Sequence, residues 1–292
     1  MRLTEIFENG RLTLSFEVFP PKADTAYESV MAATEAIAAL RPSFMSVTYG
    51  AGGGTSRHTM DIARRIEREY GIPTLAHLTC VSSTRETVRA RLSAMASLGI
   101  QNVMALRGDI PVDMRDTDRA LLDYRYAIDL VREIRDSGFD FTVGAACYPE
   151  VHPESRNAEE DIRHLKEKVD AGVDFLTTQM FFDNTLLYRF LDRARGAGIT
   201  LPVVAGIMPI TSGTQIKRAI ELSGSYMPPR YMALLDRFGD DPVAMMQAGI
   251  AYATDQIIDL YANGVKNVHV YSMNKPEVAA KIKDNLTGIL GK

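Results

Sequence analysis

The chain has 292 residues, of which 46% are hydrophobic and 24% are charged. This length can form a large core, either in one α/β domain or in two smaller ones. A net charge of −4 argues against nucleic acid or an anionic membrane surface as the main partner. No apolar run could span a membrane, and residues 1–8 lack the apolar core of a signal peptide. We therefore expect a soluble cytoplasmic protein.

Eight short apolar runs recur along the chain, each followed by a polar turn and an amphipathic segment. The runs predict strands at 12–20, 44–50, 73–81, 102–109, 142–150, 175–183, 201–210 and 267–274. The 3.6-residue periodicity between them predicts helices over 25–40, 56–70, 84–98, 124–137, 158–171, 185–197, 212–262 and 276–290.

Glycines mark the ends of the predicted helices, where a left-handed residue commonly turns the chain toward the next strand. They are Gly71, Gly99, Gly138, Gly172, Gly198 and Gly264. Alternating strands and helices with short links imply parallel strands joined by right-handed crossovers. Eight such units predict a (β/α)₈ TIM barrel, with a doubly wound open sheet as the alternative. We expect a single barrel domain over residues 1–292, with extra helices at 225–264 before the last strand.

The first predicted strand carries a carboxylate inside an apolar pattern. With a period of two, Glu17 shares a face with Ser15 and Phe19, near the carboxyl end of the strand. A glutamate at such a place is often paired with an arginine or hydrated. Burial there would instead raise its pKa above the usual value of about 4.3.

The carboxyl ends of the predicted strands are unusually polar, and active sites of barrels lie at these ends. They carry Glu17, Thr48, Tyr49, His77, Thr79, Arg107, Gly108, Asp109, Tyr148, Glu150, His152, Gln179, Tyr271, Asn274 and Lys275, with a glycine-rich run at 50–54. No metal-type cluster, nucleophile elbow or Gly-x-Gly-x-x-Gly after the first strand is present, and we expect no metal. The two cysteines, Cys80 and Cys147, are interpreted as reduced core residues. The pattern favours proton transfer by Glu17 and charge stabilisation around an organic cofactor.

Seven segments resemble one known family in their order along the chain. Residues 15–21, 46–51, 76–80, 105–109, 148–154, 168–172 and 178–183 are similar to methylenetetrahydrofolate reductase in its single-domain bacterial form. The resemblance covers residues 12–274. It implies an FAD-containing barrel that reduces 5,10-methylenetetrahydrofolate to 5-methyltetrahydrofolate, with electrons from NADH, NADPH or a redox partner protein.

The resemblance also assigns residues. The catalytic acid falls on Glu17, and Asp109 is shared between flavin and folate. The implied flavin contacts are Thr48, Tyr49, Ala51, His77, Arg107, Gly108, Asp109, Ala127, Tyr148, His152, Asp161 and Lys168. Folate contacts fall on Glu17, Asp109, Gln179, Gln215 and Lys275. Arg107 and Lys168 carry charges that suit the flavin diphosphate.

Four positions depart from the family pattern. His164 and Glu167 stand where family members carry Asn and Arg near the adenylate, and Ala219 replaces an aromatic residue. Lys275 replaces an arginine, which could grip a carboxylate with two bonds. Two other functions remain: an accessory barrel without catalysis, and a pterin-binding methyltransferase barrel. We also expect a homo-oligomer.

Overall fold

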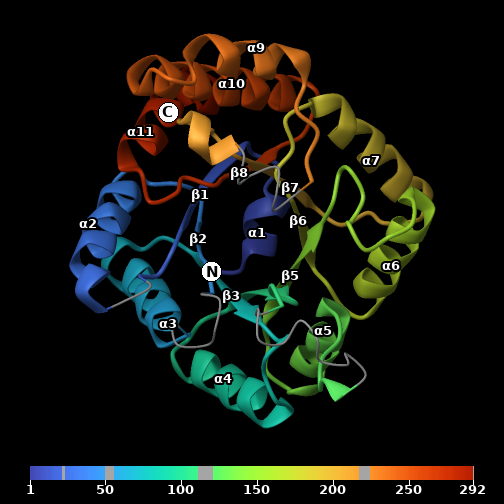
Figure 1. Ribbon diagram of the computed structural model, residues 1–292. Coiled ribbons are helices and arrows are strands. Elements are labelled where there is room, and N and C mark those ends of the chain that lie inside the picture. The colour runs from blue at the N-terminus through green and yellow to red at the C-terminus, as the bar shows by residue number, and fades with distance from the viewer. Residues whose placement is uncertain (22–23, 50–55, 111–120, 217–223, 292) are drawn as a thin grey trace.

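The computed structural model describes residues 1–21, 24–49, 56–110, 121–216 and 224–291. Within them, eight parallel strands form a closed barrel in sequence order (Figure 1). The strands are β1 (Thr13–Val18), β2 (Met45–Val47), β3 (Thr74–Thr79), β4 (Asn102–Leu106), β5 (Thr142–Cys147), β6 (Phe175–Thr178), β7 (Val203–Ile207) and β8 (Asn267–Val270). All eight predicted strands are confirmed, although each is shorter than predicted. Because β8 pairs with β1, the alternative of an open sheet is wrong.

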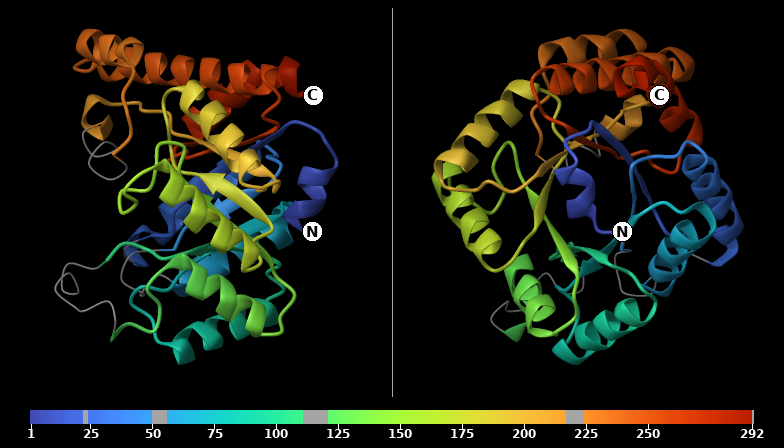
Figure 2. Two further views of the ribbon diagram at one scale, coloured as in Figure 1. Left: turned by 90° about the vertical axis from the view of Figure 1, so that its right-hand side faces the viewer. Right: turned by 180° about the vertical axis from the view of Figure 1, so that it is seen from behind.

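Helices surround the barrel as predicted. They are α2 (Tyr27–Ala38), α3 (Ser56–Arg65) with the π-helical turn η2 (Ile66–Tyr70), α4 (Arg85–Ser97), α5 (Ala127–Asp136), α6 (Ala158–Asp170), α7 (Asn184–Gly196), α9 (Pro229–Phe238), α10 (Pro242–Ala262) and α11 (Pro276–Leu290). The extra helices before the last strand are α9 and α10. Figure 2 shows them side by side at the edge of the molecule. A proline opens each of them, since its missing N–H needs no partner in the first turn. The six helix-ending glycines all have positive φ, between 65° and 115°.

The main core lies between the outer face of the strands and the helices. Phe16 and Val18 of β1 point into it, and Cys80 and Cys147 are free thiols buried in it, as predicted. The alternation along β1 thus turns Phe16 outward to the helices and Ser15 and Glu17 toward the barrel axis.

A second apolar cluster closes the amino-terminal end of the barrel. A short helix, α1 (Leu3–Glu8), lies across this end (Figure 2) and buries Leu3, Ile6 and Phe7 there. The Phe7 ring packs edge-on against Phe44 and Phe175, with centroids 6.0 and 5.2 Å away. This helix was not predicted, because six residues are too few to establish a period.

One buried carboxylate joins two of the outer helices. Glu133 of α5 is 4% exposed and accepts hydrogen bonds from Arg85 Nη1 at 2.7 Å and Arg89 Nε at 2.5 Å. Both arginines belong to α4, so the ion pairs hold the two neighbouring helices together. In the part of the chain that the structure describes, no helix combines the length and the hydropathy that a membrane crossing requires.

Candidate active site at the carboxyl end of the barrel

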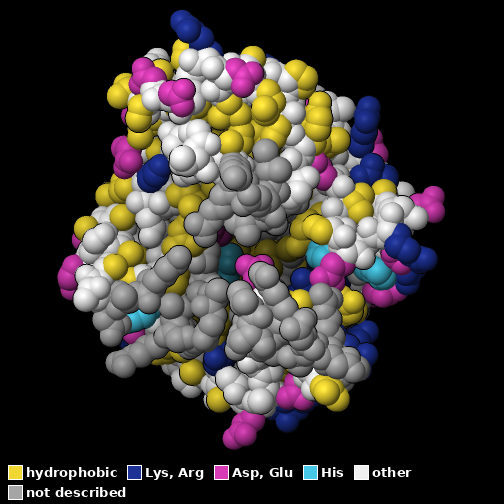
Figure 3. Space-filling model, viewed as in Figure 1, with side chains coloured by type: hydrophobic (Ala, Val, Ile, Leu, Met, Phe, Trp, Pro, Cys, Tyr) yellow, Lys and Arg dark blue, Asp and Glu magenta, His cyan; other side chains and the backbone are white. Residues whose placement is uncertain are grey.

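Most of the residues predicted for the site lie at the carboxyl end of the barrel, opposite α1. Figure 3 views this face and shows a hollow at its centre, beside which histidine and acidic side chains are visible. The strands deliver these side chains because the carboxyl ends of all parallel strands meet on one face.

Glu17 lies near the end of β1 and is 6% exposed. It is paired in register with Ser46 of β2, whose Oγ lies 3.4 Å from Glu17 Oε2. His77 Nε2 of β3 lies 3.8 Å from the same oxygen. No arginine or lysine among the described residues forms an ion pair with Glu17. An arginine partner, one alternative considered from the sequence, is therefore not found in the described part of the chain.

Burial keeps both members of this pair uncharged. It raises the pKa of Glu17 to about 8, a rise that a hydrogen bond donated by the Ser46 hydroxyl would oppose, and it lowers the pKa of His77 to about 4. At pH 7 the pair is therefore a carboxylic acid beside a neutral imidazole. The raised pKa of Glu17 confirms the expectation from its apolar strand.

A polar layer lies inside the barrel, next to Glu17. His269 of β8 is 2% exposed and pairs in register with Ser15 of β1. Its Nδ1 lies 2.7 Å from Ser15 Oγ and its Nε2 lies 2.8 Å from Ser46 Oγ. The ring stacks on Phe44 at 5.4 Å with an angle of 6° between planes. This histidine was not predicted as a site residue, although its alternation with Tyr271 at the end of β8 indicates that both side chains face the barrel interior.

Tyr271 follows β8 and reaches across the barrel. Its hydroxyl donates to the carbonyl of Thr178 at 2.6 Å, at the end of β6. A Cβ on Gly206 of β7 would lie 2.3 Å from this hydroxyl oxygen, so only glycine leaves room for the ring. Tyr271, which was predicted to lie at the rim, thus fills part of the barrel interior.

Cationic and hydrogen-bonding residues gather at the ends of β4 and β5. Arg107 Nη1 bonds Glu154 Oε1 at 2.8 Å, and the Tyr148 ring packs edge-on against His152 at 4.6 Å. Burial lowers the pKa of His152, and the charges of Glu154, Arg107, Asp161 and Lys168 act on it as well. These predicted residues therefore form one electrostatic cluster.

Lys168 joins this cluster from α6. Its ammonium group donates to the carbonyl of Ala146 at 2.5 Å, and burial lowers its pKa. Asp161, about two turns earlier on the same face of α6, is 9% exposed and accepts a hydrogen bond from Ser155 Oγ at 3.1 Å. His164 and Glu167 lie on the same helix but are exposed, and Glu167 bonds Arg163 at 3.0 Å.

The segment after β4 approaches β3 closely. Gly108 has φ of +87°, and a Cβ there would lie 2.9 Å from Thr79 Cβ. The Arg107 carbonyl accepts from the N–H groups of Cys80 and Val81 at 3.1 and 2.9 Å. These bonds fix the turn that presents Asp109, which is exposed.

The other expected folate contacts, Gln179, Gln215 and Lys275, follow β6, β7 and β8 in the chain. Gln215 Oε1 accepts from the Thr211 N–H at 2.9 Å, and Lys275 Nζ donates to Thr211 Oγ1 at 2.8 Å. Thr211 thus joins two predicted residues, and it was missed. Gln179 Oε1 accepts from the N–H of its own neighbour Met180 at 2.9 Å.

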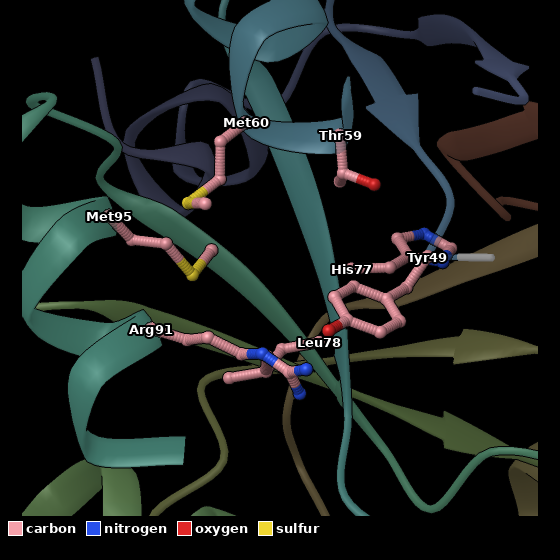
Figure 4. Close-up of a pocket in the computed structure, with 7 residues that line it drawn as sticks. All are labelled: Tyr49, Thr59, Met60, His77, Leu78, Arg91 and Met95. Atoms are coloured by element: carbon pink, nitrogen blue, oxygen red, sulfur yellow. The ribbon is translucent and has the colours of Figure 1, made fainter. Parts of the chain in front are cut away.

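A small pocket lies beside the acid, between β2, β3, α3 and α4. Figure 4 shows Tyr49 next to His77, with Arg91 beneath the Tyr49 ring. The guanidinium carbon lies 5.2 Å from the ring centroid, within range of a cation–π contact, and Arg91 was not predicted. The lining residues are Tyr49, Thr59, Met60, His77, Leu78, Arg91 and Met95.

Four further positions named from the sequence are Thr48, Ala51, Ala127 and Ala219. The Thr48 carbonyl accepts from Thr59 Oγ1 at 2.9 Å, and Ala127 is the first residue of α5. Ala51 and Ala219 lie outside the described residues. Within the described ranges, no group of three or more His, Cys, Asp or Glu side chains could hold a metal ion.

Known proteins similar in sequence to this chain carry the same enzyme name. The chain is 35% identical to a 5,10-methylenetetrahydrofolate reductase of Pectobacterium carotovorum over 94% of this chain and 89% of that one. It is 34% identical to the Escherichia coli enzyme of the same name, over 94% and 90% of the two chains. A methylenetetrahydrofolate reductase (NADH) of Zea mays is 36% identical over 98% of this chain, which spans 50% of that protein.

A solved structure shares the fold. It is an uncharacterized protein from Clostridium thermocellum, described as binding two copies of 5-methyl-5,6,7,8-tetrahydrofolic acid. The TM-score is 0.67 over 100% of this chain and 99% of that chain, with 13% sequence identity. A model of the methylenetetrahydrofolate reductase family matches residues 2–287. With a match of this extent and relatives at 34–36% identity, the chain belongs to the methylenetetrahydrofolate reductase family.

Proposed function

We propose that this protein reduces 5,10-methylenetetrahydrofolate to 5-methyltetrahydrofolate, with FAD as its cofactor and NADH or NADPH as the source of electrons. The observation that carries the proposal is Glu17, a carboxylic acid at neutral pH at the mouth of a barrel of this family. The reaction needs such an acid, because hydride reaches the bridging carbon only after the five-membered ring has opened.

Glu17 would supply the proton for that opening. The departing folate nitrogen must be protonated, and a carboxyl with a pKa near 8 still holds its proton at pH 7. His77 does not compete as the acid, since burial keeps its ring neutral. An ionised Asp109, exposed at the rim, would favour the cationic iminium form of the folate electrostatically.

The cluster at β4, β5 and α6 fits a flavin nucleotide. When bound, FAD would carry the hydride from nicotinamide to folate. Lys168 is held at the rim by one carbonyl bond, which leaves two of its three hydrogens for a diphosphate. Arg107, His152 and Tyr148 add donors around it. The remaining contacts carried over from the family are Thr48, Tyr49, Ala51, His77, Gly108, Asp109, Ala127 and Asp161.

Gln179, Gln215 and Lys275 would bind the folate. The Gln179 amide bonds only its own main chain among the described residues, so it is free to turn toward either ligand in succession. If folate and nicotinamide use the same small rim in turn, the kinetics are ping-pong. Double-reciprocal plots would then be parallel, whereas intersecting lines would contradict a shared site.

Three measurements test the function. Purified protein should be yellow and release FAD on denaturation. It should oxidise NADH or NADPH, and the reduced protein should convert 5,10-methylenetetrahydrofolate to the 5-methyl product. Absence of flavin would favour a pterin-binding methyltransferase, and flavin without either half-reaction would favour an accessory barrel.

Substitution of Lys168 tests the flavin site. Lys168→Met keeps the apolar stem and removes the charge, so flavin should bind more weakly and should be lost on dilution at a higher protein concentration than in the parent. Lys166→Met is the matched control, because Lys166 lies on the same helix and pairs with Asp170. Equal flavin retention in both variants, with circular dichroism unchanged, would contradict the placement of the diphosphate.

A further inference from the structure

A chain of hydrogen bonds runs through the barrel interior to Glu17. It begins at the main-chain carbonyl of Val268, which accepts from Ser15 Oγ at 2.9 Å. A carbonyl can only accept, and a serine has a single hydroxyl hydrogen. Ser15 therefore has no hydrogen left for His269 Nδ1, 2.7 Å away, and that nitrogen must be the donor.

The direction of this first bond fixes the tautomer of His269. The ring is buried, lies flat against Phe44 and has no carboxylate on either nitrogen, so it is neutral. Burial, with the nearby His77, lowers its pKa to about 3, in agreement. With the hydrogen on Nδ1, Nε2 is a bare acceptor. Ser46 Oγ, at 2.8 Å, then donates its only hydrogen to Nε2.

Ser46 consequently presents lone pairs to Glu17. The two oxygens are 3.4 Å apart, much longer than the 2.8 Å bond from Ser46 to His269. A carboxylate facing lone pairs gains no hydrogen bond, whereas a carboxylic acid can donate its own hydrogen to Ser46.

We propose that His269 is a positioning residue that keeps Glu17 in its acid form by holding the Ser46 hydroxyl turned away from it. The inference deepens the proposed function, since it rests on Glu17 acting as the acid. In this role His269 needs no contact with the folate. It acts through Ser46, and Ser15 sets its tautomer.

No other described side chain around Glu17 could take the place of Ser46 as a hydrogen-bond partner of the carboxyl. His77 faces the carboxyl from β3 at 3.8 Å, too far for a hydrogen bond. Tyr271, from the end of β8, gives its hydrogen to the Thr178 carbonyl. Ser272 bonds the main-chain carbonyl of Glu17 at 2.7 Å and leaves the carboxyl alone. Among the described residues, Ser46 is the one side chain within hydrogen-bond distance of the carboxyl.

The substitution His269→Phe tests the proposal in the resting protein. Phenylalanine keeps a ring against Phe44 and removes the acceptor for Ser46, whose hydroxyl then turns to Glu17. One hydrogen bond to the charged form should lower the pKa of Glu17 by about one pH unit. An infrared titration of the carboxylic acid C=O band measures this pKa, and the band that disappears in Glu17→Gln is the one to follow.

Two further variants make the test decisive. The double variant Ser46→Ala/His269→Phe has no hydroxyl to donate, so the pKa should return to the parent value or rise above it. Ser15→Ala releases the His269 tautomer without touching the ring, so it should lower the pKa in the same direction by a smaller amount. This variant decides the matter if His269→Phe fails to fold.

The outcomes separate this proposal from the proposed function. An unchanged or raised pKa in Ser15→Ala or in folded His269→Phe would overturn the role of His269. So would a lowered pKa that persists in the double variant. Expected pKa changes in a protein that does not reduce folate would instead uphold the hydrogen-bond chain and reject the folate reaction, because the titration uses no folate.

Discussion

Glu17 and Glu133 are two glutamates buried to nearly the same extent, 6% and 4% exposed, yet they differ in charge. Burial raises the pKa of Glu17 to about 8. Burial would also raise the pKa of Glu133, but hydrogen bonds from Arg89 and Arg85 outweigh it and lower that pKa. The partners, together with the greater depth of Glu17 in the protein, therefore decide the protonation state.

The two regions supply different partners. The outer helix layer places two arginines beside Glu133, and their side chains remain 52% and 66% exposed, so both cations keep much of their contact with water. The barrel interior surrounds Glu17 with serine, tyrosine and neutral histidine. A cation next to Glu17 would lower its pKa, and the ionised carboxylate would have no proton to donate at pH 7.

The largest expected effect is on folate reduction in Glu17→Gln. The amide keeps the shape but has no proton to give, so the rate should fall by at least ~10²-fold, the usual scale for a positioned acid. Flavin content and oxidation of nicotinamide with another acceptor should be unchanged. Stopped-flow measurement of each half-reaction checks this, with Glu133→Gln as the buried-glutamate control. Normal folate turnover in Glu17→Gln would show that Glu17 is not the acid.

The pH dependence of folate reduction follows from the same carboxyl. The acid form of Glu17 is lost as pH rises through about 8, so the rate should fall about tenfold for each further pH unit. The pKa values of His77 and His269, about 4 and about 3, lie outside that range and add no step there. Rates at saturating folate between pH 6 and 10 measure the profile. A flat profile would show that another group supplies the proton.

The contributions of the two glutamates to the free energy of unfolding should change with pH in opposite directions. Between pH 4.5 and 8 the unfolded chain ionises Glu17 while the folded protein keeps the proton, so rising pH favours unfolding. Relative to Glu17→Gln, the parent should lose up to about 1.4 kcal/mol of unfolding free energy per pH unit in that window. Ionised Glu133 stabilises the folded protein above pH 4.5, and this stabilisation is lost as the pH falls through the lowered pKa of Glu133. Urea titrations at several pH values test both, and trends of equal sign would refute the contrast.

The smallest expected effect is that of Glu133→Gln on stability at pH 7. Two charge-assisted bonds are lost, but both arginines are half exposed and can rehydrate. We therefore expect a loss of about 1–2 kcal/mol in the free energy of unfolding. Chemical denaturation measures it, and Glu8→Gln, at an exposed position, serves as the control. A loss no larger than that of the control would mean that the ion pairs add nothing.

The regular elements of the fold were predictable because they repeat. Eight apolar runs and six glycines recur at similar spacing, and the structure confirms the strands, the helix ends and the barrel. Non-repeating elements were missed or blurred. The helix α1 is too short for a period. The predicted helix over 212–262 is not continuous, because residues 239–241 separate α9 from α10 in its described part.

The location of the candidate site residues could be predicted where position along a strand was enough. Glu17, His77 and Arg107 lie at the carboxyl ends of strands, as expected. The contact of Ser15 with His269 could not be predicted, because it depends on the register between β1 and β8, 254 residues apart in the chain. Arg91 was missed for a related reason, since its place over Tyr49 depends on how α4 packs against the barrel.

The helix α1 covers the amino-terminal end of the barrel with apolar side chains. Phe7 packs on Phe44, and Phe44 is the surface on which His269 lies, so only two rings separate this helix from the histidine next to the acid. Water admitted through that end would solvate an ionised Glu17 and weaken its hold on the proton. A polar residue at position 7 would therefore act as an active-site mutation from the far end of the barrel, by way of hydration and without touching a ligand.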